Sequence, residues 1–244
     1  MTVSPDTPVL VAAAAVEQKL DDHLQAREAC QLMIDAVVDA AASAACPRLP
    51  ELAQRIYVPK GMWEYSDPAR LVGDGIGATS ATTVLANFGI LQQTLIGDAC
   101  ARIAAGEIDV AIVTGGEHRY RGLRAQIAGA EAAETAQPGV QPDVFLEPED
   151  ELWLAQETFA GLGMPVGFYA IMESSLRAAD GLGLEEHRDR VAAMYQRFSE
   201  IAADNPHAWK RQPVPAETIR DPGPKNPMLA FPYTKLHNTS WNVD

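Results

Sequence analysis

The chain has 244 residues, of which 47% are hydrophobic and 21% are charged, and its formal net charge is -14. This length suits one large domain or two small ones. The excess of acidic residues argues against nucleic acid or an anionic membrane surface as the main partner, because phosphate binding requires clustered lysines and arginines.

The cysteines and the hydropathy pattern indicate a cytoplasmic protein. Cys30, Cys46 and Cys100 are too few and too scattered for a disulfide framework, and none belongs to a CxxC pair typical of zinc sites. We therefore expect small thiols that are buried or half-buried, no metal site and a reducing compartment. The N-terminus lacks the positive charge of a signal peptide, and no apolar run approaches the ~20 residues that span a bilayer.

The N-terminal part begins with alternating strand and helix patterns. Residues 8–14 form a short apolar run, which predicts a buried first strand. Apolar residues then recur three or four positions apart over residues 26–45, which is the period of a helix, and Pro47 ends this helix. Residues 55–58 predict a second strand, and we expect a short helix around residues 69–71.

A further strand, helix and strand follow in the same order. Residues 81–85 are a β-branched stretch that leads into a turn at residues 87–89. Residues 90–105 keep one apolar face and predict a long helix, and residues 109–114 are a continuous apolar run. This order implies a right-handed crossover and a parallel sheet. Residues 1–120 are therefore predicted to form a layered α/β domain with helices on both faces of the sheet.

The second half of the chain has a different pattern. Residues 120–148 show little periodicity and are interpreted as an insertion or linker. Two helices are predicted within residues 164–203, separated by two glycines, and the proline-rich chain beyond Asn205 is expected to be extended. Residues 121–244 are therefore predicted to form a largely helical loop or insertion domain with an extended C-terminal segment.

A glycine-rich stretch at residues 73–77 invites comparison with nucleotide-binding loops. Its spacing is not GxGxxG, and no strand clearly precedes it. The stretch therefore predicts a flexible loop.

Several motifs follow one another along the chain in a characteristic order. They are Asn87-Phe88-Gly89, the run from Ala104 to His118 that contains Gly115-Gly116-Glu117, Met164 to Ala170, Ser199 to Ala208, Phe231 to Leu236 and Trp241 to Asp244. This order resembles the thiolase superfamily, in particular its sterol-carrier-type branch. The resemblance covers essentially all 244 residues and implies the N-terminal half of a thiolase, with a mixed, mostly parallel sheet, followed by the family's loop domain.

The resemblance also implies where a nucleophile belongs. The family delivers a cysteine to a helix N-terminus, where the helix dipole and free N–H groups lower the thiol pKa, and the thiolate takes an acyl group from coenzyme A. Counting back from Gly106 assigns this position to Gly89, flanked by Asn87 and Phe88. Cys100 lies about three helical turns further on and is too far away to substitute. We therefore predict no catalytic residue here and a degenerate active site.

The family's remaining catalytic groups come from a C-terminal half that we expect to be missing from this truncated sequence. His118, His187, His207 and His237 fall in none of the family's catalytic motifs and are predicted to be surface or structural residues.

In the loop domain, basic side chains are candidates for coenzyme A phosphates. The alternative is a solvated basic face that balances nearby acidic residues. The candidates are Arg188, Arg190, Arg197, Lys210 and Arg211, and the balancing acids are Glu185, Glu186 and Asp189.

Three hypotheses of function remain open from the sequence. The chain is an acyl-CoA acyltransferase related to acetyl-CoA acetyltransferases of lipid metabolism, a non-catalytic relative that binds acyl-CoA, or an interaction subunit that pairs with a partner supplying the missing half. We expect no permanently bound cofactor, coenzyme A or acyl-CoA as the ligand, and a homo- or hetero-oligomer. An exposed apolar face of a half-thiolase would require such a partner.

Overall fold

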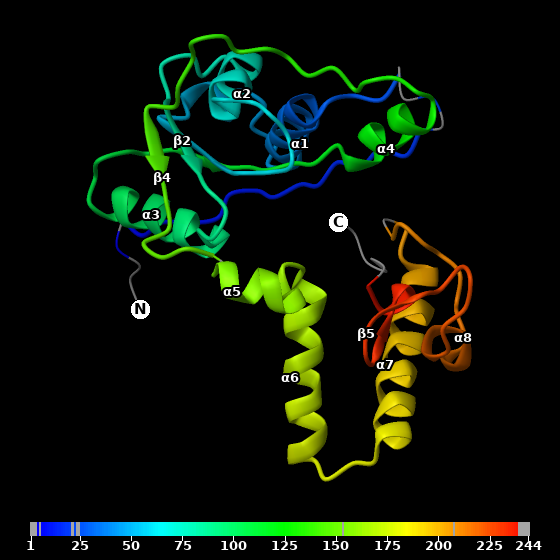
Figure 1. The fold of residues 1–244 in the computed structure, drawn as a ribbon. Coiled ribbons are helices and arrows are strands. Elements are labelled where there is room, and N and C mark those ends of the chain that lie inside the picture. The colour runs from blue at the N-terminus through cyan, green and yellow to red at the C-terminus, as the bar shows by residue number, and fades with distance from the viewer. Residues whose placement is uncertain are drawn as a thin grey trace. The chain divides into compact units, whose positions relative to one another are not determined.

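The computed structural model describes residues 4, 6–20, 22, 25–152, 154–206 and 208–238. It divides into two compact units, residues 1–152 and residues 153–244 (Figure 1). The sequence predicted a boundary after residue 120. The division falls later because residues 121–152 add a strand to the sheet of the first unit.

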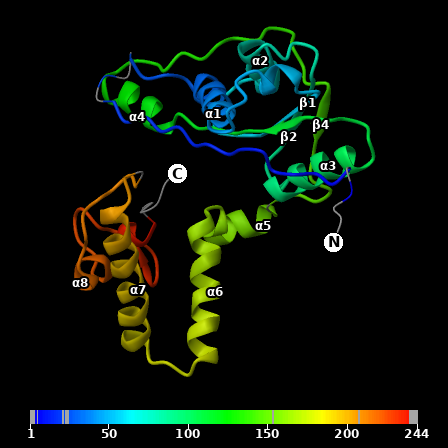
Figure 2. The same cartoon turned by 180° about the vertical axis from the view of Figure 1, so that it is seen from behind.

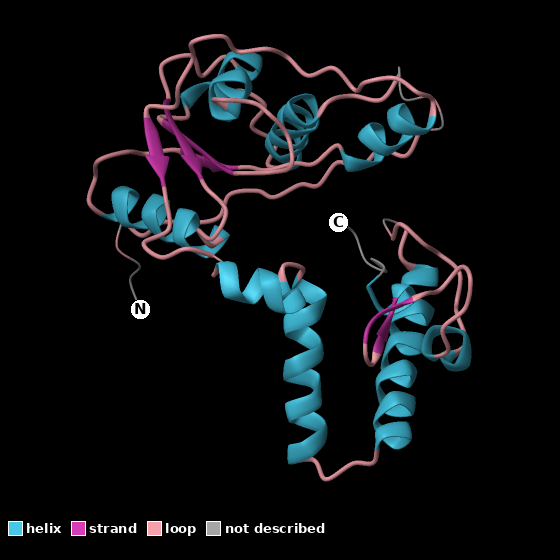
Figure 3. Ribbon diagram, in the orientation of Figure 1, coloured by secondary structure: helices cyan, strands magenta, loops and turns pink. Residues whose placement is uncertain are grey.

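The first unit is built on a parallel sheet of four strands (Figure 3). The strand order is β3-β1-β2-β4, and all three neighbouring pairs run parallel. The α/β fold class predicted from the sequence is therefore confirmed. The strands are β1 (Arg55–Pro59), β2 (Thr82–Ala86), β3 (Ala111–Val113) and β4 (Val144–Leu146).

Helices pack on both faces of this sheet because successive strand residues point to opposite sides. Figure 2 shows α1 and α2 on one side of the sheet and α3 on the other. Ile56 and Val58 of β1 join the core formed with α1 and α2, whereas Tyr57 joins the core formed with Leu95 of α3. The helical segments of the first unit are α1 (Ala29–Ser43), η1 (Leu49–Leu52), α2 (Pro68–Ile76), α3 (Gln92–Ala104) and α4 (Arg119–Ile127).

The predicted first strand is wrong. Residues 8–14 form neither strand nor helix, and Val9 and Leu10 are 71% and 87% exposed. The two interior positions of the sheet are occupied by β1 and β2, which pair with each other and with the two edge strands. An apolar run predicts a buried strand only where a sheet edge pairs with it.

The glycine-rich stretch at residues 73–77 is helix, so the predicted loop is also wrong. Asp67 caps α2 by accepting a hydrogen bond from the N–H of Arg70 at 3.0 Å, and Gly77 ends the helix with a φ of 83°. The glycines inside the helix allow close packing. A Cβ at Gly75 would lie 2.5 Å from Cδ1 of Ile34.

The second unit contains two long helices, as predicted, and further short elements that the sequence did not predict. The segment after Asn205 holds a helix and an antiparallel hairpin instead of an extended chain. Its elements are α5 (Ala155–Glu157), η2 (Thr158–Leu162), α6 (Pro165–Ala179), α7 (Leu184–Asp204), α8 (Ala216–Arg220), β5 (Met228–Ala230), β6 (Tyr233–Thr234) and η3 (Lys235–Asn238).

Within the described residues, no helix is both long enough and apolar enough to cross a bilayer.

Candidate functional site

The carboxyl ends of β1, β2 and β3 lie at one edge of the sheet because the three strands are parallel. Ligand sites of open parallel sheets form at this edge, in the loops that follow the strands. Here those loops are residues 60–63, residues 87–91 and residues 114–118. The turn to which the family resemblance assigns the nucleophile is one of them.

Two backbone hydrogen bonds hold the turn after β2 in place. The N–H of Asn87 donates to the carbonyl of Leu146 at 2.8 Å, and the N–H of Ile90 donates to the carbonyl of Asn87 at 3.1 Å. Gly89 has a φ of 99°, in the region that favours glycine. A Cβ on Gly89 would lie 3.2 Å from both Cβ and Cγ of Pro148. The turn is therefore fitted to a residue without a side chain.

No thiol stands at this turn. Cys100 lies inside α3, about 12 Å along the helix axis from its first residue. Cys46 is exposed beyond the end of α1, and Cys30 is buried within α1. Burial, assisted by the negative charge of Glu28, raises the pKa of Cys30 to about 12, so this thiol stays protonated at neutral pH.

The loops after β1 and β3 are locked together by polar contacts. Nε1 of the buried Trp63 donates to the carbonyl of Gly116 at 2.9 Å, and the N–H of Met62 donates to Oε1 of Glu117 at 2.8 Å. Nζ of Lys60 donates to the carbonyl of Trp63 at 2.7 Å and lies 4.6 Å from the centre of a Trp63 ring. Lys60 and Glu117, at this edge of the sheet, therefore both stabilise the loops through hydrogen bonds.

His118, which follows β3, has a structural position. Its Nε2 lies 2.9 Å from Oε1 of Glu134, and its Nδ1 accepts the N–H of Ala29 at 3.4 Å. It therefore joins the start of α1 to a distant loop. In the second unit, His187 and His237 are buried among side chains, whereas His207 lies outside the described residues.

A hollow of about 390 Å³ lies beside the start of α1. Glu28 accepts hydrogen bonds from the hydroxyl of Tyr65 at 2.9 Å and from the N–H of Thr135 at 2.7 Å. Burial acts to raise the pKa of Glu28, but these bonds and the charge of Arg121 outweigh it and hold the pKa below its usual value. Its carboxylate is thus already satisfied. The hollow is lined by Arg27, Glu28, Gln31, Arg121, Ala133, Glu134 and Thr135.

The candidate phosphate ligands of the second unit do not form one cluster. Arg188 donates to Glu185 at 2.8 Å. Arg190 and Arg197 lie two turns apart on the side of α7 opposite to Arg188. Arg190 pairs with Asp180 and Arg197 pairs with Glu200, while Arg211 donates to the carbonyl of Ala203 at 3.3 Å. Lys210 precedes Arg211 in the segment beyond α7. The three helix arginines thus have acidic partners, and a role in coenzyme binding stays a prediction.

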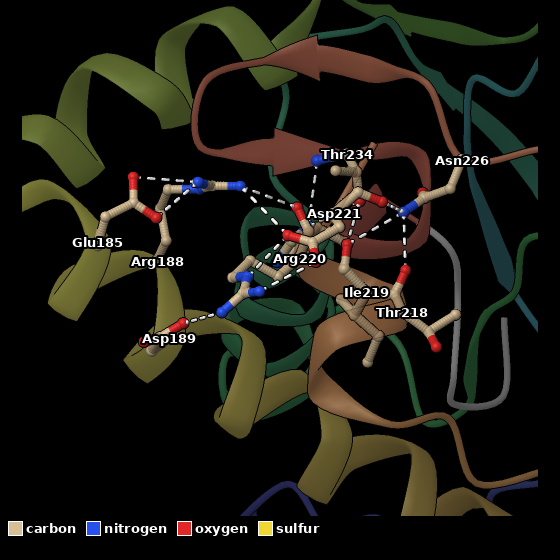
Figure 4. Close-up of polar contacts among 10 residues, drawn as sticks. Glu185, Arg188, Asp189, Thr218, Ile219, Arg220, Asp221, Asn226 and Thr234 are labelled. Atoms are coloured by element: carbon tan, nitrogen blue, oxygen red, sulfur yellow. Dashed lines mark hydrogen bonds and ion pairs between the residues drawn. The ribbon is translucent and has the colours of Figure 1, made fainter. Parts of the chain in front are cut away.

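A polar network that sequence reasoning missed holds α8 against the hairpin of the second unit (Figure 4). Nδ2 of Asn226 donates to the carbonyls of Thr218, Ile219 and Asp221 at 3.0 to 3.1 Å, and its Oδ1 accepts the N–H of Leu236 at 2.9 Å. The only signal in the sequence is an asparagine within a proline-rich stretch, which also suits an ordinary turn.

Among the residues that the structure describes, no group of three or more His, Cys, Asp or Glu side chains is arranged to hold a metal ion.

Comparison with known proteins relates the chain to one fold. No protein-family model and no curated protein matches the sequence. Among solved structures, a monomeric SCP2-thiolase-like protein type 1 from Mycobacterium smegmatis matches with a TM-score of 0.66 and 21% sequence identity. The match covers 96% of this chain and 43% of that one, so this chain spans less than half the length of the matched structure. The likeness shows a thiolase-like fold.

Proposed function

We propose that this chain, which has a thiolase-like fold, binds acyl-coenzyme A without forming a covalent acyl intermediate. The observation that carries the proposal is the turn at Gly89, where the family places its nucleophile. This residue has no side chain, and a Cβ there would lie only 3.2 Å from Cβ and Cγ of Pro148, which is closer than an ordinary contact. The family resemblance supplies the ligand class, and the pinned turn at the carboxyl edge of the sheet is where we expect the thioester to lie.

Acyl transfer through another residue has little support in the geometry. A thiolate is the form that attacks a thioester, and the raised pKa of Cys30 keeps that thiol protonated. Direct transfer needs a free general base. Glu117 already accepts the N–H of Met62, and Lys60 already donates to Trp63. Binding without turnover is therefore the function we infer.

Calorimetric titration of the chain with coenzyme A and with acetyl-CoA tests this proposal, with mass spectrometry of the same samples to detect acylated protein. We expect binding and no covalent adduct. A stable adduct would contradict the non-covalent mechanism, and the absence of binding would overturn the ligand class.

A matched pair of phenylalanine variants locates the ligand. Phe88 at the turn is 45% exposed, and Phe145 on the edge strand β4 is 48% exposed. Phe88→Ala is expected to weaken acyl-CoA binding, because this ring lies at the proposed thioester position. Phe145→Ala removes the same ring from β4, where Phe145 pairs with Leu85, three residues before Phe88, and should weaken binding less than Phe88→Ala does. Equal effects in both variants would place the ligand elsewhere.

A second candidate function is that of an interaction subunit. Leu91 and Ile96 at the start of α3 are exposed apolar residues close in sequence to the turn, and such groups often mark a protein interface. Analytical ultracentrifugation of the chain and of the Ile96→Gln variant tests this alternative. It predicts self-association that the variant loses, together with no response to acyl-CoA.

A further inference from the structure

Helix α6 of the second unit is hardly buried, although most of its residues are apolar. Ala170 is the only buried residue among its 15. The side chains of Tyr169, Met172 and Leu176 lie on one stripe and are 58% to 59% exposed. Helix α7 differs, because it buries five residues: His187, Val191, Ala192, Ser199 and Ala202. Apolar burial therefore contributes little to holding α6 in place.

Polar contacts of one carboxylate hold α6 instead. Oε1 of Glu173 lies 3.0 Å from Nε2 of His187 on α7, and its Oε2 accepts a hydrogen bond from the hydroxyl of Tyr233 on β6. The imidazole contact does not have hydrogen-bond geometry, so it acts as an ion pair when His187 is protonated. We refer to Glu173, His187 and Tyr233 as the Glu173 clasp.

The clasp is shielded from water, which strengthens its electrostatic contacts. The side chains of Glu173 and His187 are 17% and 6% exposed. Burial, and then the hydrogen bond to Glu173, raise the pKa of Tyr233, so its hydroxyl remains a donor over the physiological range. One charged group thus joins three elements of the second unit.

The helical backbone geometry is interrupted by a glycine on each side of α6. The helical segment that precedes it has non-helical geometry at Gly161, with a φ of 83°, and Gly181 follows α6 with a φ of 68°. Changes of backbone angles at such positions allow a rigid helix to move as a unit.

We propose that α6 is a hinged arm of the second unit, which the Glu173 clasp holds closed. In the closed position, α6 and Phe231 of the hairpin form an open groove of about 440 Å³. Opening at the two glycines would separate the small residues of α6 from Phe231 and widen this groove. The groove is lined by Ala170, Ile171, Ser174, Ser175, Ala178 and Phe231.

Hydrogen–deuterium exchange of the full chain tests the arm. Glu173→Gln keeps the size of the side chain and removes its charge. Once released from the clasp, α6 loses its tertiary support, and an isolated helix of 15 residues is only marginally stable in water. We therefore expect amides of residues 165–179 to exchange at least about tenfold faster in this variant, while those of residues 191–202 keep their rates. The matched control is Glu186→Gln, which makes the same change at an exposed position and should alter neither segment.

Two outcomes would overturn the proposal. Unchanged exchange of residues 165–179 in Glu173→Gln would mean that the clasp does not hold the helix. Equally faster exchange in residues 191–202 would mean that the whole unit opens together and that α6 is not a separate arm. Tyr233→Phe, which removes one contact of the clasp and keeps the ring, should give a smaller acceleration confined to residues 165–179.

Discussion

The first unit packs large apolar side chains against both faces of its sheet, including Ile56, Val58 and Trp63 on one side and Tyr57 and Leu95 on the other. The second unit buries chiefly small residues in its hydrophobic cluster and relies on side chains that hydrogen-bond to backbone carbonyls. Burial of apolar area resists local changes in chain geometry, whereas a polar network depends on a few donors and acceptors. The two units should therefore respond differently to single substitutions.

The largest expected effect is the loss of a core side chain in the first unit. Trp63→Ala removes a fully buried indole and its hydrogen bond to Gly116. We expect the free energy of opening of the first unit to fall by about 3 to 5 kcal/mol. Hydrogen–deuterium exchange of the β1 amides measures this free energy of opening. The neighbouring Met62→Ala, at an exposed position, should change the value by less than about 0.5 kcal/mol.

The corresponding test in the second unit is Asn226→Ala. This variant leaves three carbonyl groups without their side-chain donor, and we expect the second unit to lose about 2 to 3 kcal/mol. Exchange should accelerate in α8 and the hairpin and stay unchanged in β1. The exposed Glu217→Ala on α8 serves as the control. An effect of equal size on β1 would contradict the independence of the two units.

Apolar patterns in the sequence predicted most of the long elements, including helix α6, whose apolar stripe is exposed in the structure. The strands β1, β2 and β3 and the helices α3, α6 and α7 all follow apolar patterns, and the structure contains each of them. Strand β4 was missed because it is a short edge strand in which Phe145 stays exposed. The apolar run at residues 8–14 gave a wrong prediction of a strand, because composition does not reveal whether a sheet edge pairs with the run.

The candidate site was only partly predictable, for a similar reason. The order of motifs singled out Gly89 from the sequence alone. The contact that makes a side chain unfavourable there comes from Pro148, which lies beyond two further helices and two further strands in the chain. Long-range contacts of this kind leave no periodic pattern. The same holds for Glu173, which meets His187 and Tyr233 only after the second unit has folded.

Acid should weaken the second unit through His237. Burial, and then the charge of Arg188, lower its pKa from 6.5 to about 4, while Nδ1 accepts the N–H of Thr234. As the pH falls, the imidazole of His237 is therefore protonated at a higher pH in the unfolded unit than in the folded unit. The stabilisation is complete above pH 6.5 and decreases as the pH falls toward 4, by about 2 kcal/mol at pH 5. His237→Gln should flatten this part of the pH profile in exchange measurements, and an unchanged profile would contradict the assignment.

The smallest expected effect concerns the turn at Gly89 and bears most directly on function. Gly89→Cys introduces a thiol at the position that the family resemblance assigns to the nucleophile, but it places a Cβ at a φ of 99° and 3.2 Å from Pro148. We expect the first unit to lose about 1 to 2 kcal/mol, measured by exchange of the β2 amides.

Gly97→Ala is the matched control for that variant. Gly97 lies within α3, and a Cβ there would meet no atom within 4 Å. Alanine should therefore stabilise the helix by about 0.5 to 1 kcal/mol. Opposite signs in the two variants would show that the turn, and not the mere presence of glycine, excludes a side chain. A Gly89→Cys variant that is as stable as the natural chain and becomes acylated by acetyl-CoA would instead mean that the turn still accepts a nucleophile, and that only the missing thiol prevents covalent chemistry.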